Sequence, residues 1–396
     1  MNMLTKDRQD AVIELCRKLV RQKSYSGEEN GVAAELKLFF EGHGFDDVFV
    51  DDYGNMIGHI KGNRPGKKLL FDGHMDTVPV TDPAVWEHDP FAADIADGKI
   101  FGRGTSDMKG ALAAMASAAA NFAADSGKNF AGDIYVSGVV HEECFEGVAA
   151  RKISERVKPD YVVIGESSQL NIKIGQRGRA EIVVETFGKP AHSANPEKGI
   201  NAVYKMCRVI EAIRTLTPTQ HPVLGNGILE LTDVKSAPYP GASVVPEYCR
   251  ATYDRRLLVG ETKESVLKPI QDLLQKLMAE DSELKAKVSY AVGTETCYTG
   301  NKITDERFFP GWLYDKEEPF VQDVLKEMRA EGFEPQITQY NFCTNGSHYA
   351  GEAGIKTLGI GPSQESLAHT LNEYIETEQL TKVAEAYYAV MKALLR

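Results

Sequence analysis

Acidic and imidazole side chains gather in five short stretches of the sequence. They are His74 and Asp76 in GHMDTVP, Asp107 in GRGTSDMKG, Glu142 and Glu143 in HEE, Glu166 in GES, and His369 in AHT. Imidazole nitrogens and carboxylate oxygens bind zinc and several other divalent cations. Two such ions about 3.5–4 Å apart form a clamp for hydrolysis, and a carboxylate between them lowers their repulsion. Two histidines and three carboxylates fit this ligand set, and one glutamate of the adjacent pair is free to move a proton.

Each stretch taken alone also has an ordinary structural explanation. His74 could be a capping or core histidine, and Asp107 could be the N-cap of the alanine-rich segment that follows it. The pair Glu142–Glu143 could be a solvated turn, and Glu166 after a strand is weaker evidence still. The joint occurrence of all five stretches in this order favours a metal site. Asp76 adds to it, because a carboxylate can hydrogen-bond the second ring nitrogen of a metal-binding histidine.

The segments around these stretches alternate between strand and helix patterns. This alternation predicts an α/β fold with a mixed, largely parallel sheet flanked by helices. Three of the stretches directly follow a predicted strand, and ligand sites form beyond the carboxyl ends of such strands. The expected helices are 1–25, 31–42, 110–124, 147–157, 319–330 and 376–395, and the expected strands are 47–51, 55–60, 68–71, 133–140, 161–164, 336–340 and 356–360.

A different pattern of elements begins near residue 178 and indicates a separate domain inserted into the first. The order strand, helix, strand, strand, helix, strand predicts a small α+β sandwich. The expected division is therefore 1–178 and 295–396 for the two parts of the main domain, with 179–294 inserted between them. The expected elements of the insertion are strands 179–187, 227–234, 247–257 and 287–292, and helices 199–216 and 262–279.

Composition excludes several other classes of protein. The 396 residues are 42% hydrophobic, enough for a packed core, and the formal net charge is −12. An acidic balance argues against binding nucleic acid. The longest weakly polar run, 111–124, is shorter than the roughly 20 residues of a membrane span. The six cysteines are scattered, and charged residues fill the N-terminus where a secretion signal needs apolar ones, so we expect a cytoplasmic protein without disulfides.

The motifs GHMDTVP and GRGTSDMKG, with the later EE, GES and AHT, resemble those of a zinc-dependent amidohydrolase and exopeptidase family. This family includes succinyl-diaminopimelate desuccinylase, acetylornithine deacetylase, aminoacylase and carboxypeptidase G, and the chain looks most like its selenium-metabolism-linked hydrolase branch. The resemblance implies two Zn²⁺ per subunit, with Co²⁺ or Mn²⁺ as substitutes. It assigns His74, Asp107 and Glu166 to one ion, and Asp107, Glu143 and His369 to the other. It also makes Glu142 the general base and lets Asp76 orient His74.

The implied reaction is hydrolysis of the amide bond of an N-acyl amino acid or a small dipeptide by metal-activated water. In the resembled family, the histidine at the position of His192 reaches the partner subunit's active site and stabilises the oxyanion, so we expect a homodimer formed through the inserted lid domain. Arg256 matches an arginine that binds a substrate carboxylate. The segment Thr344, Asn345 and Gly346 matches one that lines the substrate pocket. In isolation, His192 could also be a turn histidine and Arg256 a surface strand residue.

Two positions depart from the family pattern, and two other functions stay open. Ser243 stands where many relatives carry asparagine, and we expect this difference to affect the contact with the oxyanion or the substrate. Val259 stands where proline is usual. One alternative is an N-carbamoyl amino acid amidohydrolase, although relatives of that type tend to have histidine at the position of Glu166. The other is a metal-binding relative without catalysis. Glu142 argues against it, because that side chain is not needed to bind zinc.

Overall fold

Helix α1 (Lys6–Arg21) opens the part of the chain that the computed structural model describes, residues 4–396. The Thr5 hydroxyl accepts a hydrogen bond from the backbone N–H of Arg8 and caps the first turn. The apolar residues on one side of the helix are buried, namely Val12, Leu15, Cys16, Leu19 and Val20. The helical spacing of these residues thus gives the helix one face that packs on the protein.

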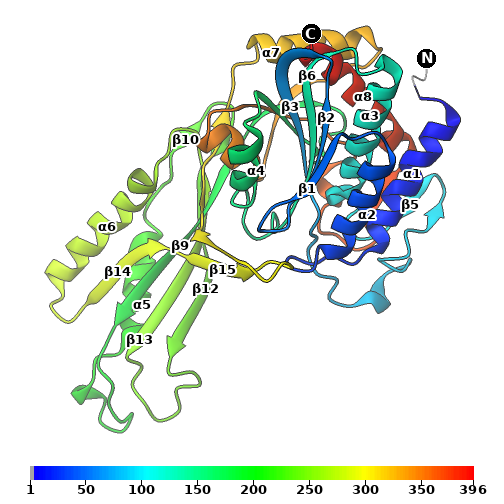
Figure 1. Cartoon of the computed structure of the whole chain (residues 1–396). Coiled ribbons are helices and arrows are strands. Elements are labelled where there is room, and N and C mark those ends of the chain that lie inside the picture. Colours follow the sequence, from blue (N-terminus) through cyan, green and yellow to red (C-terminus); the bar gives the residue numbers. More distant parts are fainter. Residues whose placement is uncertain (1–3) are drawn as a thin grey trace. The chain divides into compact units, whose positions relative to one another are not determined.

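Helix α3 (Gly110–Ser126) is almost completely buried, which explains its alanine-rich sequence. Small side chains let the helix pack closely against α1 and α8 (Thr377–Leu394). Together with α2 (Asn30–Gly42), these helices cover one face of the central sheet (Figure 1). The predicted helix 110–124 is confirmed, and it continues for two more residues.

The central sheet has parallel strands in its middle and antiparallel strands at its margins. Its order in this part of the molecule is β1-β2-β6-β3-β7-β20-β8, and β19 also pairs with β8. Strand β3 lies parallel to both β6 and β7, whereas β2 is antiparallel to β6. The prediction of an α/β fold with a mixed sheet flanked by helices is confirmed, and the sheet, predicted to be largely parallel, is partly parallel. The bounds are β1 Asp47–Val50, β2 Met56–Lys61, β3 Arg64–His74, β6 Ala131–Val139, β7 Tyr161–Ile164, β8 Ile172–Gln176, β19 Ile337–Tyr340 and β20 Lys356–Gly359.

Two of these strands differ from expectation. Strand β3 is longer than the predicted 68–71, because it starts in a polar, exposed stretch and continues as far as His74. Strand β8 was not predicted, because the charged Lys173 interrupts a short apolar run. In the structure the ammonium group of Lys173 is 2.9 Å from Glu365 Oε1 and donates to the carbonyl of Gln339. Pairing its charge makes it possible to bury this lysine within a strand.

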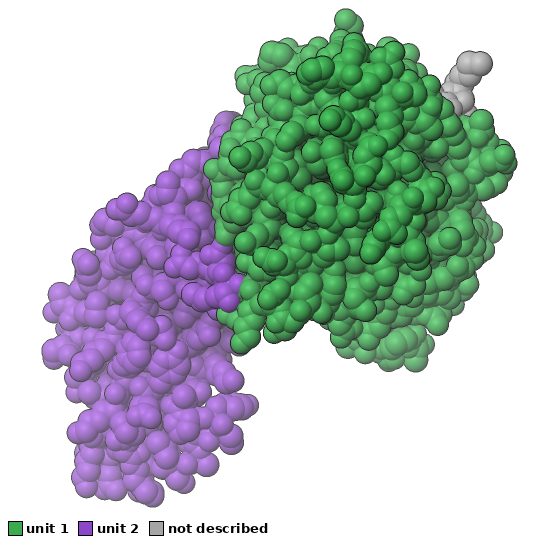
Figure 2. All heavy atoms as spheres, viewed as in Figure 1, with its two compact units in different colours: residues 1–176, 294–303, 313–396 green, residues 177–293, 304–312 purple. Residues whose placement is uncertain are grey.

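The described chain divides into two units, coloured separately in Figure 2. One unit holds residues up to 176, 294–303 and 313–396, and the other holds 177–293 and 304–312. The sequence-based division places 304–312 in the last part of the main domain. In the structure this stretch groups with the second unit, because β17 (Phe308–Phe309) pairs with β9 (Gly178–Phe187).

The second unit is built on an antiparallel sheet of order β12-β13-β9-β14. Helices α5 (Ala202–Ile213) and α6 (Lys263–Glu280) pack against the sheet and against each other. Their apolar sides share one core with the strands, which includes Ile182, Val209, Ala251, Ile270 and Leu274. The remaining strands are β12 Ile228–Ala237, β13 Tyr248–Leu257 and β14 Lys285–Tyr290.

Shorter elements complete the two units. They are α4 Ala150–Val157, α7 Pro319–Ala330, the strands β4 Ile95–Ala96, β5 Lys99–Phe101, β10 Gln220–His221, β11 Gly225–Asn226, β15 Val292–Thr296, β16 Lys302–Glu306, β18 Trp312–Leu313 and β21 Tyr374–Glu376, and the helical turns Pro83–Val85, Thr105–Lys109, Pro196–Lys198, Ser347–Glu352 and Glu365–Leu367. Within residues 4–396, no helix combines the length and the apolar character needed to cross a membrane.

Candidate metal centre

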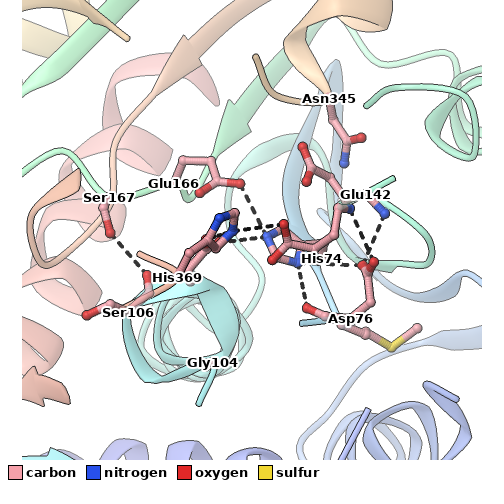
Figure 3. Close-up of polar contacts among 12 residues, drawn as sticks. His74, Asp76, Gly104, Ser106, Glu142, Glu166, Ser167, Asn345 and His369 are labelled. Carbon is pink, nitrogen blue, oxygen red and sulfur yellow. Dashed lines mark hydrogen bonds and ion pairs between the residues drawn. The ribbon is translucent and has the colours of Figure 1, made fainter. Parts of the chain in front are cut away.

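Three neighbouring strands of the first unit end beside one another and carry the polar stretches. His74 is the last residue of β3, Glu142 and Glu143 follow β6, and Glu166 follows β7. Because β6, β3 and β7 are adjacent and parallel, their carboxyl ends meet at one edge of the sheet. Figure 3 shows the imidazoles of His74 and His369 lying among Glu142 and Glu166. The fold therefore gathers side chains that lie up to 295 positions apart.

Asp107 lies between the two imidazoles and faces each with a different oxygen. Its Oδ1 is 2.9 Å from Nε2 of His74, and its Oδ2 is 3.1 Å from Nε2 of His369. The residue sits in the irregular turn Thr105–Lys109, just before α3, and the Asp107–Met108 peptide bond is cis. A carboxylate shared in this way is what a bridging ligand between two cations requires.

Each imidazole also faces a second carboxylate. Glu166 Oε1 is 3.4 Å from His74 Nε2, and Glu143 Oε2 is 3.0 Å from His369 Nε2. Potential ligand atoms of His74, Asp107 and Glu143 all lie within 4.8 Å of one another, as do those of His74, Glu142 and Glu166. The first set joins His74 and Glu143, which the family resemblance assigns to different ions, and the second brings Glu142 close to His74.

The second ring nitrogen of His74 is held by a backbone carbonyl. Its Nδ1 donates to the carbonyl oxygen of Asp76 at 2.9 Å, whereas the Asp76 carboxylate is 3.6 Å away. Because a carbonyl only accepts, Nδ1 carries a proton, and Nε2 is the ring nitrogen that faces the carboxylates and would bind a cation in place of its own proton. The Asp76 carboxylate instead accepts from the backbone N–H groups of Glu142 and Glu143, at 3.1 and 3.2 Å. Asp76 thus fixes the turn that carries both glutamates, while its backbone orients His74.

Among residues 4–396, the ion-pair partners of Asp107, Glu143 and Glu166 are the imidazoles of His74 and His369. Burial, then the charge of Asp107, raises the pKa of Glu143 to about 7, and burial raises the pKa of Glu142 well above its usual range. One oxygen of each glutamate, Oε1, is buried and has no hydrogen-bond partner among residues 4–396. A bound divalent cation would stabilise these carboxylates, so the residues present fit a metal ion.

Comparisons with known proteins identify the family of this chain. Residues 70–393 match the model of "Peptidase family M20/M25/M40". The chain belongs to this family. It is 32% identical over 390 residues to the "Uncharacterized protein YgeY" of Escherichia coli (strain K12), covering 97% of this chain and 94% of that one. It is 27% identical over 410 residues to the "Succinyl-diaminopimelate desuccinylase 2" of Ruegeria sp. (strain TM1040), covering 99% and 98%.

The crystal structure of aminopeptidase PepT from Bacillus cereus ATCC 10987 has the same fold, with a TM-score of 0.74, 22% identity and 98% coverage of both chains. Hydrolases of the M20 family depend on metal ions, often two. The protein is therefore a metal-dependent hydrolase, and Asp107 with the four residues around it, His74, Glu143, Glu166 and His369, forms its candidate metal site.

The segment Thr344–Gly346 lies in the same unit, but its side chains are occupied by contacts with the protein. Asn345 donates to Oδ1 of Asp72 at 2.9 Å and accepts from the backbone N–H of Gly147 at 2.8 Å. The hydroxyl of Thr344 donates to Gln176 at 2.6 Å. Both residues are buried. A substrate contact by this segment would therefore have to use its backbone, while its side chains stabilise the strand ends.

The other residues that the family resemblance assigns to the site lie in the second unit and are more exposed. His192 is on the surface, and its Nδ1 accepts from the backbone N–H of Ala194. Ser243 lies on the adjacent loop, where its carbonyl accepts from the N–H of Ser193 at 3.1 Å. Arg256 pairs with Asp254 at 2.9 Å on strand β13. None of the three side chains is fixed as firmly as the residues of the pocket.

Three residues that support the pocket, Ser26, Glu29 and Glu373, are not among those predicted from the sequence. The hydroxyl of Ser26 donates to Oδ2 of Asp76 at 2.6 Å. Glu29, fully buried, accepts from the backbone N–H groups of Gly27 and His141. Glu373 accepts from the N–H of Asp107. Of the three, only Glu373 could have been suspected from the sequence, because it lies four residues after the candidate ligand His369. The other two come from the N-terminal segment, and nothing in its sequence indicates that it packs against the site.

Proposed function

We propose that this hydrolase cleaves the amide bond of an N-acyl amino acid or a small dipeptide, with Glu142 as the general base. The observation that carries the proposal is the arrangement of two imidazoles around one shared aspartate, with the buried carboxylate of Glu142 beside them. The relative named as a desuccinylase supports an acylated amine as the substrate.

The chain holds residues for two divalent cations, for which zinc is our first choice and cobalt or manganese are possible substitutes. His74, Asp107 and Glu166 would hold one ion, and Asp107, Glu143 and His369 would hold the other. When bound, such ions polarise a carbonyl oxygen and lower the pKa of water. The imidazole of His369 is about half exposed, with 53% of its side chain accessible, so we expect substrate to enter on its side of the pocket.

Glu142 would transfer the proton in this reaction. Its backbone is fixed by the bond from its N–H to Asp76, and one of its oxygens is buried without a partner in the described chain. That oxygen would take a proton from the attacking water and deliver it to the leaving amine. Because burial disfavours its charged form, a nearby cation would be needed to keep Glu142 ionised and able to act as a base.

The exposed residues of the second unit would complete recognition of the substrate. His192 accepts a backbone hydrogen bond at Nδ1, which leaves its Nε2–H free to donate to an oxyanion. The guanidinium group of Arg256 would bind the substrate carboxylate, for which its planar fork is suited. We propose that the protein is a homodimer in which His192 serves the active site of the other copy. Ser243 would lie beside this contact, since the two loops are joined by a backbone hydrogen bond.

A substrate panel on protein of measured metal content tests the proposal. N-acetyl and N-succinyl amino acids, N-carbamoyl amino acids and dipeptides are assayed as isolated, after chelation, and after adding back zinc, cobalt or manganese. The variant E142Q, purified in parallel, excludes a contaminating peptidase. We expect metal-dependent cleavage of acylated amino acids or dipeptides. Cleavage of carbamoyl compounds alone, or metal binding without any hydrolysis, would refute the proposed reaction.

A further inference from the structure

The side chain of Glu373 lies behind the metal pocket and is completely buried. It follows His369 by four residues, and its carboxylate points into the turn that carries Asp107. Oε1 accepts from three backbone N–H groups of that turn, those of Gly104, Ser106 and Asp107, at 3.1, 2.8 and 3.1 Å. One carboxylate oxygen thus binds three backbone N–H groups of the turn that presents Asp107, the last of them that of Asp107 itself.

The other oxygen of Glu373 pairs with a buried arginine. Nη1 of Arg103 donates to Oε2 at 2.6 Å, and the guanidinium group lies 5.2 Å from the centre of the Trp86 ring. Burial raises the pKa of Glu373, whereas Arg103 and the backbone N–H groups favour its charged form. The site also lies at the entrance to α3, where a helix favours negative charge. The carboxylate is therefore fully used by the protein and takes no part in binding metal.

Two more hydrogen bonds join the same pair of segments. The backbone N–H of Gly102 donates to the carbonyl of Glu373 at 2.9 Å, and the Ser106 hydroxyl donates to the carbonyl of Tyr374 at 2.6 Å. The turn 102–107 and the segment 369–374 are thus held together around the Glu373 side chain. These two segments supply Asp107 and His369, whose facing atoms are 3.1 Å apart.

We propose that Glu373 is a positioning residue that sets the distance between Asp107 and His369 and so creates the second cation position. This inference rests on the two-ion site of the proposed function. His74 ends strand β3 and Glu166 follows strand β7, so the pairing of these strands in the central sheet places both side chains. The Asp107–Glu143–His369 position takes two of its three ligands from the segments that Glu373 joins. Loss of Glu373 should therefore weaken this position more than the one around His74.

The test compares E373Q and E373D with the control E376Q, the same change at an exposed glutamate three residues later. Glutamine cannot satisfy both Arg103 and the three N–H donors, and aspartate is one methylene too short to reach them. Metal affinity is measured by competition with a chromophoric chelator, and the two positions are distinguished by the visible spectrum of bound Co²⁺. We expect one position to weaken by about 10–100-fold in both variants while the other stays close to wild type. E376Q should bind both ions normally.

Equal weakening of both positions would show a merely structural role and overturn the proposal, as would unchanged affinity at both. A second measurement does not depend on whether the variants fold. In the wild-type protein treated with chelator, the amides of Gly104, Ser106 and Asp107 should stay protected from hydrogen exchange, because their acceptor belongs to the protein. Rapid exchange of these amides would also refute the proposal. If the wild type binds two ions but hydrolyses nothing, the proposed reaction fails while the role of Glu373 can still be tested.

Discussion

The metal pocket of the first unit and the surface loops of the second unit differ in how firmly their functional groups are held. In the pocket, His74, Asp107 and Glu166 are buried, and Asp107 is fixed through both its side chain and its backbone. In the second unit, His192 is exposed and makes one hydrogen bond with its own loop. The difference indicates that the first unit by itself holds the candidate metal ligands in place. The exposed groups would acquire their function when a substrate or a second copy meets them.

A second contrast lies within the first unit. The pocket glutamates have raised pKa values because they are buried together. For Glu352, burial also acts to raise the pKa, but hydrogen bonds from His348 and Arg151 lower it to about 2. Glu352 thus has an arginine as well as an imidazole as partner, whereas Glu143 and Glu166 face imidazoles only, and burial outweighs these contacts in the pocket.

The largest effect should come from removing the charge that lies between the imidazoles. In D107N the amide keeps the size of the side chain but cannot bridge two cations. We expect metal affinity to fall by more than about 100-fold, the upper range for residues that only support a ligand, and hydrolysis to be lost. Two measurements check this: the metal content that remains after dialysis, and the rate of turnover. D97N, at an exposed turn, is the matched control. A D107N protein that retained two ions would contradict the bridging role.

Replacing the proposed general base, Glu142, should lower turnover without lowering metal affinity. In E142Q we expect kcat to fall by about 10²–10⁴-fold, the range typical of a general base, while both ions stay bound. Steady-state kinetics and metal analysis of the same preparation check this. The assignment of Glu142 is wrong if the variant keeps most of its kcat, or if its turnover falls only in proportion to lost metal.

Removing an exposed group of the second unit should affect turnover but not metal binding. For H192A we expect kcat to fall by about 10²–10³-fold, as for loss of an oxyanion donor. Mixing H192A with E142Q tests the homodimer, because a mixed pair would have one site with both groups present. Recovered activity after subunit exchange supports action on the partner copy. No recovery would mean that His192 acts within its own chain or not at all.

A smaller effect on substrate binding is expected for Arg256. R256A loses a charged hydrogen-bond donor, which should lower kcat/KM by about 10–100-fold, mainly through KM. For substrates with a blocked carboxylate, kcat/KM should differ little between wild type and R256A, because these substrates cannot bind the arginine. R250A, an arginine on the same strand, is the control. Equal losses for free and blocked substrates would show that Arg256 does not bind the carboxylate.

The smallest effect concerns stability away from the pocket. Because the folded-state pKa of Glu352 is lowered from 4.5 to about 2, its ion pairs stabilise the folded protein above pH 4.5, and this stability is lost as the pH falls towards 2. E352Q should lower the free energy of unfolding by about 1–3 kcal/mol at neutral pH and by almost nothing near pH 2. Urea unfolding of chelated protein measures this, with the exposed E334Q as control. If the difference in unfolding free energy between wild type and E352Q were the same at neutral pH and near pH 2, the prediction would be wrong.

Much of the fold follows from local patterns in the sequence. Helices α3 and α7 and the strand 161–164 lie where spacing and propensity place them, because each buries one continuous apolar pattern. Strand β8 could not be predicted, since its second residue, Lys173, is a buried lysine whose partners Glu365 and Gln339 lie far away in the sequence. Residues 304–312 join the second unit through pairing with β9, which depends on contacts across more than a hundred residues.

The sequence by itself determined the types of ligand at the candidate site and their order along the chain, because each lies in a short motif next to a strand or helix. Only the tertiary structure decided how they are held. It showed that the backbone of Asp76, rather than its carboxylate, bonds the ring of His74, and that the side chain of Asn345 is used inside the protein. It also brought Ser26, Glu29 and Glu373 to the pocket. Hydrogen bonds between distant segments depend on the packing of whole helices and strands, and no local pattern in the sequence records them.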